Sequence, residues 1–382
     1  MDSAALRALA ALETPALLVE RASLERNLVR MQARADALGV RLRPHVKTHK
    51  CRAVWERQVA LGARGITVST LKEADAFHAF GATDVLYAAC LAPNKLVHAL
   101  GLRRAGCALT VLVDSVAAAR ALVEFGREHG EPFEVMLEID TDDHRAGLQP
   151  DDERLLAVAA ELDRPGARLA GVMTHAGGSY AFSDPAALRA CAERERAGCV
   201  HAAERLRASG HECREVSVGS TPTALSAATL EGVTELRAGV YVFQDLVMLG
   251  IGVCAREELA LSVLTSVTGH QRAKGWVLVD AGWLAMSRDR GTAGQARDHG
   301  YGAVTTLDGG WLEELNFRDA NQEHGILVAD ATLDVERAFP IGTQLRILPN
   351  HACATAAAFP RYHVLDEHAQ LHPTTWERLH GW

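Results

Sequence analysis

The stretch RPHVKTHK, residues 43–50, decides how the rest of the chain is interpreted. Residues 40–46 alternate and include β-branched side chains, which indicates a strand, and Pro44 favours extended backbone at Arg43. Lys47 then lies at the end of this strand, where its side chain can project into a cleft, with His45 on the same face. We therefore predict that Lys47 is an amine nucleophile for a carbonyl cofactor. The alternative is an ordinary solvated lysine.

The part of the chain from residue 22 to residue 252 alternates between strand-like and helix-like segments. This alternation predicts an α/β fold with a parallel sheet, and eight such units match a closed (β/α)8 barrel. A doubly wound open sheet is the alternative. The predicted strands cover residues 40–47, 66–69, 84–88, 109–113, 133–139, 169–174, 215–218 and 234–237.

Polar residues follow several of the predicted strands at their C-terminal ends, which is where barrel enzymes place their chemistry. We expect these residues to surround one rim, and this favours the barrel over the open sheet. In chain order they are Lys47, Asp140, Arg145, His175-Ala176-Gly177-Gly178, Gly219-Ser220-Thr221, Gly239 and Tyr241.

Two of these segments suit a phosphate group. Loops after the seventh and eighth strands of such barrels often bind phosphate through backbone N–H groups, and Gly219-Ser220-Thr221 and Gly239-Val240-Tyr241 fall at those places. Either segment alone could be a turn with capping hydroxyls. Together with Lys47 they predict pyridoxal 5'-phosphate as the cofactor, with Lys47 as its Schiff-base lysine. We predict further cofactor contacts from Arg145, His175 and Tyr180, each of which could instead be structural.

The strand–helix rhythm stops after about residue 251, and we predict a second domain over residues 253–382. Short β-like runs separated by turn residues indicate a mainly antiparallel β domain, and residues 1–21, with a strand at 14–20, are expected to associate with it. The predicted strands of this domain cover residues 261–267, 275–280, 325–328, 344–348 and 361–365.

An H-x-C pair lies late in the chain, at His351 and Cys353. If the extended run at 344–348 continues, both side chains point to one side and could bind a divalent cation, most plausibly Zn²⁺. The alternative is a core histidine beside a buried cysteine. Two protein ligands leave room for water and substrate, as a catalytic metal requires. The nearby segment Gln322-Glu323-His324-Gly325 could support the site.

A charged loop, Ser287-Arg288-Asp289-Arg290-Gly291, follows the strand end Asp280-Ala281-Gly282-Trp283. One interpretation is a solvated turn, and the other is that an arginine of this loop binds an anionic substrate.

The composition favours small-molecule chemistry. The formal net charge of −8 and the absence of a basic run with interleaved aromatics argue against binding to nucleic acid. No apolar stretch is long enough for a membrane span, so we expect a soluble, cytoplasmic protein without a membrane partner. The eight cysteines form no C-x-x-C pair, and we expect most of them to be reduced and buried.

These motifs together resemble those of the metal-dependent D-threonine aldolase and D-serine dehydratase-like family of fold-type III pyridoxal phosphate enzymes. The segments that carry the resemblance are RPHVKTHK, THAGG, SVGSTPT, DAGW, QEHG and PNHACAT. The resemblance implies an alanine-racemase-type barrel followed by a β domain, working as a homodimer. It also implies that Lys47 is the Schiff-base lysine and that His351 and Cys353 bind the metal, which could be Zn²⁺, Mn²⁺ or Co²⁺.

The resemblance also bears on the reaction. Aldolases of this family tend to carry H-x-D at the metal, whereas its dehydratases carry H-x-C, as here. We therefore expect a lyase that removes water from a D-3-hydroxy amino acid, and a substrate with a second carboxylate, such as 3-hydroxyaspartate, would suit the arginine-bearing loop. D-serine is a further candidate substrate. The alternatives are a metal-dependent D-threonine aldolase, a racemase, which would not need the metal pair, and a non-enzymatic pyridoxal phosphate carrier, which would lack the second domain.

Overall fold

The computed structural model describes residues 3–329 and 333–381, which fall into two compact units. The barrel unit comprises Arg30–Lys47 and Val54–Gly239, and the β unit comprises the chain up to Val29, Thr48–Ala53 and Val240–Gly381. The octapeptide at 43–50 therefore passes from one unit to the other between Lys47 and Thr48.

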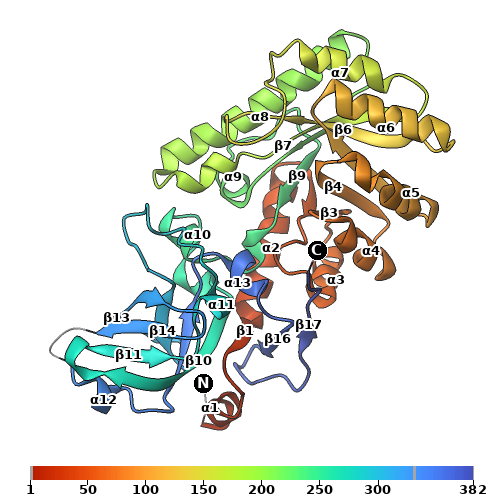
Figure 1. Ribbon diagram of the computed structural model, residues 1–382. Coiled ribbons are helices and arrows are strands. Elements are labelled where there is room, and N and C mark those ends of the chain that lie inside the picture. The colour runs from red at the N-terminus through yellow and green to blue at the C-terminus, as the bar shows by residue number, and fades with distance from the viewer. Residues whose placement is uncertain (1–2, 330–332, 382) are drawn as a thin grey trace. The chain divides into compact units, whose positions relative to one another are not determined.

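The barrel unit contains an eight-stranded parallel sheet in the order β2-β9-β8-β7-β6-β5-β4-β3. A parallel bridge between His45 and Thr67, with the Val46 N–H donating to the Thr67 carbonyl at 3.0 Å, joins the two ends of this sheet. The fold is therefore the predicted barrel rather than an open sheet (Figure 1). Its strands are β2 (Arg41–Pro44), β3 (Ile66–Val68), β4 (Asp84–Cys90), β5 (Ala108–Val113), β6 (Phe133–Ile139), β7 (Ala167–Thr174), β8 (Glu215–Val218) and β9 (Glu235–Ala238).

Helices connect successive barrel strands, and Figure 1 shows α4 to α8 on the outer side of the sheet. The helices are α2 (Arg21–Ala37), α3 (Arg52–Ala60), α4 (Leu71–Ala79), α5 (Leu96–Arg104), α6 (Val116–Glu128), α7 (Arg154–Leu162), α8 (Pro185–Ala208) and α9 (Thr221–Ser226), with short 3₁₀ turns at Pro93–Lys95 and Gly177–Ala181. Each predicted barrel strand is present. The first is shorter than predicted, because β2 ends at Pro44 and Lys47 lies in the turn that follows.

The β unit is organised around a nine-stranded sheet in the order β11-β14-β13-β12-β15-β10-β1-β16-β17. The predicted early strand is β1, which pairs antiparallel with β10 and parallel with β16. The sheet is otherwise antiparallel, as expected. Its strands are β1 (Ala16–Glu20), β10 (Leu261–Gln271), β11 (Trp276–Val279), β12 (Ala303–Thr306), β13 (Trp311–Ala320), β14 (Gly325–Ala329), β15 (Gln344–Leu348), β16 (Arg361–Leu365) and β17 (Trp376–Glu377).

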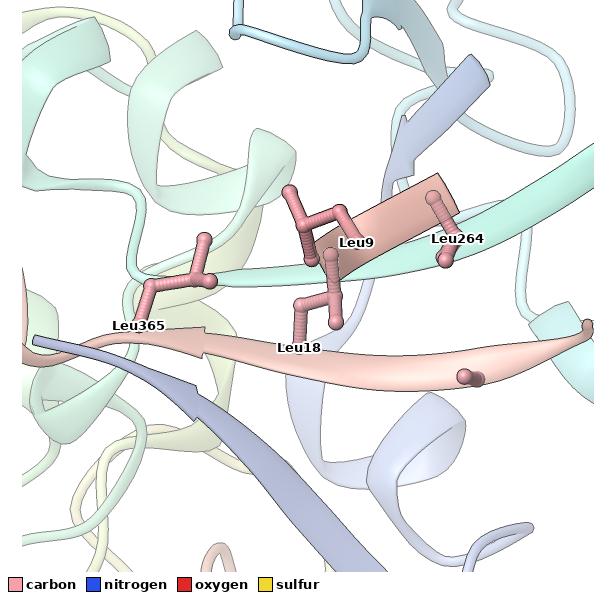
Figure 2. Close-up of a cluster of buried hydrophobic side chains, with 5 residues drawn as sticks. Leu9, Leu18, Leu264 and Leu365 are labelled. Atoms are coloured by element: carbon pink, nitrogen blue, oxygen red, sulfur yellow. The ribbon is translucent and has the colours of Figure 1, made fainter. Parts of the chain in front are cut away.

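Short helices complete the β unit. They are α1 (Ser3–Ala10), α10 (Leu246–Gly250), α11 (Trp283–Met286), α12 (Val335–Ala338) and α13 (Ala352–Ala356), with 3₁₀ turns at Val240–Val242, Arg256–Glu258 and Arg272–Lys274. One apolar cluster ties the N-terminal helix to the sheet: Leu9 of α1 packs with Leu18, Leu264 and Leu365, all fully buried (Figure 2). Burial of this apolar surface fixes α1 and β1 on a sheet whose other strands lie more than 240 residues later.

The units divide the chain at 239/240, earlier than the predicted boundary at 252/253. Residues after Gly239 belong with the β unit because Leu246 and Val247 donate backbone hydrogen bonds to the Pro349 and Asn350 carbonyls, at 3.1 and 3.3 Å. The start of α2 joins the same unit through Asn27, whose side-chain amide donates to the Val242 and Glu258 carbonyls.

Within residues 3–329 and 333–381, no helix has the length and apolar composition needed to cross a membrane.

Candidate active site

The turn after β2 presents Lys47 at the C-terminal end of the barrel. Its backbone N–H lies 3.4 Å from Nδ1 of His45, whose Nε2 lies 3.3 Å from the hydroxyl of Ser69. Among the residues that the structure describes, none forms an ion pair or side-chain hydrogen bond with the exposed Lys47 amine. The amine is therefore not neutralised by a carboxylate of the barrel.

Two imidazoles of the barrel unit are kept neutral by their surroundings. Burial, together with the positive charges of Lys47 and Arg237, lowers the pKa of His45 well below its usual value. The pKa of His175 is lowered to about 3, mainly by burial and further by the positive charges of Lys47, Arg237 and Arg145. The hydrogen bond between His175 and the Gly219 carbonyl raises this pKa and so opposes part of the effect. Both rings are uncharged at neutral pH, and both lie within the electrostatic influence of Lys47.

His175 has a defined orientation. Its Nδ1 lies 3.0 Å from the Gly219 carbonyl oxygen, and since a carbonyl can only accept, the neutral ring carries its proton on Nδ1 and a lone pair on Nε2. The ring centroid of Tyr180 lies 6.4 Å away. Arg145 is exposed on the loop after β6, with Nη2 3.9 Å from Oε1 of Glu138. The barrel thus brings Lys47, His45 and His175 together, with Arg145 and Tyr180 beside His175.

A buried carboxylate, which the sequence did not single out, joins the loops after β7 and β8. Oε1 of Glu195, on α8, accepts the backbone N–H groups of Ala176 at 2.9 Å and Gly219 at 3.1 Å. Burial raises the pKa of Glu195, and hydrogen bonds from Thr223 and these two N–H groups oppose that rise. Glu195 therefore holds the backbone next to His175 and also Gly219, whose carbonyl orients the His175 ring. Glu195 lies between Arg194 and Arg196 in the sequence, and this charged segment gives no local indication of its buried role.

The Gly219-Ser220-Thr221 segment is a tight turn that starts α9. Gly219 has φ +135°, and a Cβ there would lie 2.1 Å from the Arg237 carbonyl oxygen, so only glycine fits. The Gly219 N–H donates to Glu195, and the Ser220 N–H donates to Thr223 Oγ1 at 3.0 Å. These two N–H groups, which we had predicted to bind phosphate, are already engaged inside the barrel.

Gly239 and Tyr241 lie on either side of the division between the two units. Tyr241 is fully buried in the 3₁₀ turn Val240–Val242 of the β unit. Their assignment as cofactor contacts stays a prediction, as does that of Gly219, Ser220 and Thr221.

In the β unit, His351 and Cys353 approach each other in a different way from the one predicted. The extended run of β15 ends at Leu348, His351 is the N-cap residue of α13, and Cys353 lies in the first turn of that helix. The helix forms here because the Ala352 N–H donates to the buried carboxylate of Asp245 at 2.9 Å. The His351 and Cys353 side chains nevertheless form a hydrogen bond with each other.

Asp289 and Thr48 complete the surroundings of this pair. Oδ2 of Asp289 lies 2.5 Å from Nδ1 of His351, and Oγ1 of Thr48 lies 3.1 Å from Sγ of Cys353. Burial lowers the pKa of His351. The charges of Cys353 and Asp245 and the hydrogen bonds with Asp289 and Cys353 more than offset this and raise the pKa to about 11. Among the described residues, no group of three or more His, Cys, Asp or Glu side chains is arranged to hold a metal ion.

Two further motifs have defined places in the β unit. Asp280 is not a solvated turn residue, because its carboxylate accepts hydrogen bonds from Thr14, Thr265 and the Ser266 N–H. Residues 321–324 form the turn between β13 and β14, in which the Asn321 N–H donates to the His324 carbonyl at 2.8 Å.

Comparison with known proteins identifies both parts of the chain. The model for "Alanine racemase, N-terminal domain" matches residues 19–246, and that for "Putative serine dehydratase domain" matches residues 260–365. The chain is 60% identical to D-threo-3-hydroxyaspartate dehydratase of Delftia sp. strain HT23, over 97% of this chain and 98% of that enzyme. The chain belongs to the D-threonine aldolase and D-serine dehydratase-like family.

The similarity to members of this family extends over more than nine tenths of the chain. D-serine dehydratase of Dictyostelium discoideum is 31% identical over 94% of this chain and 95% of that enzyme. D-threonine aldolase of Arthrobacter sp. is also 31% identical, over 91% of this chain and 87% of that enzyme. The family resemblance read from the motifs is thus confirmed.

A solved structure of a family member agrees with the fold. The structure of the Delftia dehydratase has a TM-score of 0.96 and covers 98% of this chain and 99% of that one. Variants of that enzyme have also been solved, including an H351A variant and a C353A variant in the metal-free form. The alanine-racemase-type barrel and the following β domain are therefore confirmed.

Proposed function

We propose that this protein is a pyridoxal 5'-phosphate- and divalent-metal-dependent dehydratase that converts D-threo-3-hydroxyaspartate into oxaloacetate and ammonia, and that also acts on D-serine. The observation that carries the proposal is the 60% identity to D-threo-3-hydroxyaspartate dehydratase over 97% of the chain. The reaction balances: loss of water gives an enamine, and its hydrolysis releases the keto acid and ammonia.

The residues of the barrel fit pyridoxal phosphate. Lys47 offers an amine without a carboxylate partner, and two neutral imidazoles lie beside it. When bound, the cofactor supplies an electron sink for negative charge on the substrate α-carbon. We propose that Lys47 would hold the cofactor and that its Nζ would accept the α-proton of the substrate. His45 and His175 are uncharged, so neither imidazole places a second positive charge beside the Lys47 amine.

The β unit fits a divalent cation with open coordination positions. His351 and Cys353 supply an imidazole and a sulfur ligand in direct contact, and this donor set suits Zn²⁺ as well as Mn²⁺ or Co²⁺. A bound metal supplies a Lewis acid for the leaving hydroxide. Asp289 accepts from Nδ1 of His351 and so leaves Nε2 of the same ring for the metal. Thr48 contacts Cys353 within the β unit and would support this sulfur ligand.

A product assay tests this proposal. The purified protein is given D-threo- and D-erythro-3-hydroxyaspartate, D-serine and D-threonine, with and without added Zn²⁺ or Mn²⁺. We expect ammonia and oxaloacetate from the threo compound and ammonia and pyruvate from D-serine. Glycine with an aldehyde in place of ammonia would instead indicate an aldolase, the activity named for the Arthrobacter relative. Absence of any product would reject a catalytic role and leave a cofactor carrier.

Assembly and location are further parts of the proposal. We propose that the enzyme is a cytoplasmic homodimer that binds neither nucleic acid nor membranes, in keeping with its net charge of −8. Sedimentation of the purified enzyme and fractionation of the cells that produce it test these two expectations.

A further inference from the structure

The charged loop at residues 287–291 is fastened to the segment that carries the H-x-C pair. Asp289 contacts His351 through its carboxylate, and its backbone carbonyl accepts a hydrogen bond from the Asn350 side chain at 3.3 Å. The hydroxyl of Thr292, just beyond the loop, donates to the same Asn350 side chain at 2.9 Å. Arg288 directly precedes Asp289, and their Cα atoms are about 3.8 Å apart. The backbone of Arg288 therefore lies near His351, which Asp289 contacts.

The three arginines of this region differ in what they bind. Arg290 forms an ion pair with Asp298 at 2.7 Å, and Arg297 forms one with Glu313. Arg290 also lies over an aromatic ring, with Cζ 5.3 Å from the ring centroid of Tyr301. Arg288 stacks more closely, with Cζ 4.0 Å from the ring centroid of Trp283. In the part of the chain that the structure describes, Arg288 has no carboxylate partner.

The backbone of Trp283, whose ring lies under Arg288, is held by the turn between β13 and β14. The Trp283 N–H donates to the Asn321 carbonyl at 2.8 Å. Gly282 allows this approach, since a Cβ there would lie 2.3 Å from the Gln322 carbonyl oxygen. Stacking on this ring orients the guanidinium plane and leaves its N–H edge available for the two oxygens of a carboxylate.

The chemistry of the substrate indicates what this guanidinium binds. In 3-hydroxyaspartate, the 3-hydroxyl and the second carboxylate are attached to the same carbon. A hydroxyl that reaches a metal held by His351 and Cys353 therefore brings the carboxylate close to the same two residues. D-serine has a hydrogen atom where 3-hydroxyaspartate has this carboxylate.

We propose that Arg288, stacked on Trp283, binds the second carboxylate of 3-hydroxyaspartate and makes the enzyme prefer this substrate over D-serine. The inference rests on the proposed function and specifies its substrate preference.

The test compares Arg288→Gln with Arg290→Gln, which removes an arginine of the same loop that is already paired with Asp298. The kcat/KM of each variant is measured for D-threo-3-hydroxyaspartate and for D-serine. Binding of malate, which has two carboxylates and a hydroxyl but no amine, is measured by calorimetry on the holoenzyme.

For Arg288→Gln we expect kcat/KM for 3-hydroxyaspartate to fall about tenfold to hundredfold relative to that for D-serine, because a charge-assisted bidentate contact is lost. Malate affinity should fall by a similar factor, and Arg288→Lys should recover part of both. Arg290→Gln should change neither the ratio of the two kcat/KM values nor the malate affinity. An equal loss for both substrates, or unchanged malate affinity, would overturn the inference. If the unaltered enzyme releases no ammonia from either substrate, the proposed function fails, and malate affinity alone then decides the role of Arg288.

Discussion

Oγ1 of Thr48 lies 3.1 Å from Sγ of Cys353, although 305 residues separate them in the chain. Thr48 directly follows Lys47, and it is fixed in the β unit with its neighbours, since the Tyr362 hydroxyl donates to the His49 carbonyl at 2.6 Å. The polypeptide that carries the proposed cofactor lysine therefore continues directly into a contact with a proposed metal ligand.

This contact predicts a role for Thr48 in metal binding. Thr48→Val keeps the shape of the side chain but removes the hydroxyl that contacts Cys353. We expect the affinity for Zn²⁺ or Mn²⁺ to fall about tenfold to hundredfold, the usual effect of losing a group that supports a metal ligand. Competition with a chelator of known affinity measures the change. Thr48→Ser, which keeps the hydroxyl, should bind metal nearly as the unaltered protein does, and equal affinity in all three proteins would contradict the prediction.

Lys47→Ala should abolish covalent attachment of the cofactor. After treatment with borohydride, mass spectrometry should detect a reduced pyridoxal adduct on the unaltered protein and none on the variant. Ammonia release should fall by at least about a hundredfold, because the variant also lacks the proposed base. Lys72→Ala, on the exposed side of α4, is the matched control and should keep both properties. An adduct on the Lys47→Ala variant would show that another lysine attaches the cofactor.

The barrel strands could be predicted because each is a short apolar run between helical segments, and burial on both faces imposes that pattern. In the β unit, β12, β13 and the two-residue strand β17 were not predicted. β13 carries charged residues at four of its ten positions, and only Leu315 and Phe317 in its centre are buried. A strand with one solvated face and a register shift gives a weak pattern in the sequence.

The site was predictable only where the chemistry lies in one short motif. Lys47, His351 and Cys353 were singled out in this way, but the helix start at Ala352 depends on Asp245, more than 100 residues away, and could not be predicted locally. The same holds for Asp289 on His351 and for Glu195, which act through contacts between distant segments. Gly219 was recognised as a turn residue, but the partners of its N–H group depend on α8.

Chelation should separate the roles of metal and cofactor. Removing the metal should stop ammonia release but leave the visible absorbance of the bound cofactor unchanged, because we assign cofactor attachment to Lys47 rather than to His351 or Cys353. Adding Zn²⁺ or Mn²⁺ should restore the activity of the unaltered enzyme. Cys353→Ala should remain inactive at the same metal concentration. An enzyme indifferent to the chelator would make the H-x-C pair structural.

Glu195→Ala should destabilise the barrel. The variant leaves the N–H groups of Ala176 and Gly219 without their acceptor, and each such buried donor costs about 1–3 kcal/mol. We expect the free energy of unfolding, measured in urea, to fall by about 2–4 kcal/mol. Glu195→Gln keeps an acceptor oxygen and should lose less than half as much. Equal losses in the two variants would show that the charge of Glu195, rather than these hydrogen bonds, stabilises the loops.

His175 should make the stability of the barrel fall in acid. Its pKa is about 3 in the folded protein and about 6.5 in the unfolded chain, so the unfolded chain binds more protons between these two values. Stability from this group is therefore complete above pH 6.5 and is lost as the pH falls towards 3, by at most about 1.4 kcal/mol per pH unit. His175→Asn can still donate to the Gly219 carbonyl but does not titrate.

Urea unfolding at a series of pH values checks this prediction. Below pH 6.5 the unaltered protein should lose stability faster than His175→Asn, and above it the two curves should run parallel. His324→Asn, in the exposed turn between β13 and β14, should follow the unaltered protein throughout. Parallel curves for His175→Asn at every pH would show that His175 takes up its proton equally in the folded and unfolded states, and that burial does not keep its ring neutral.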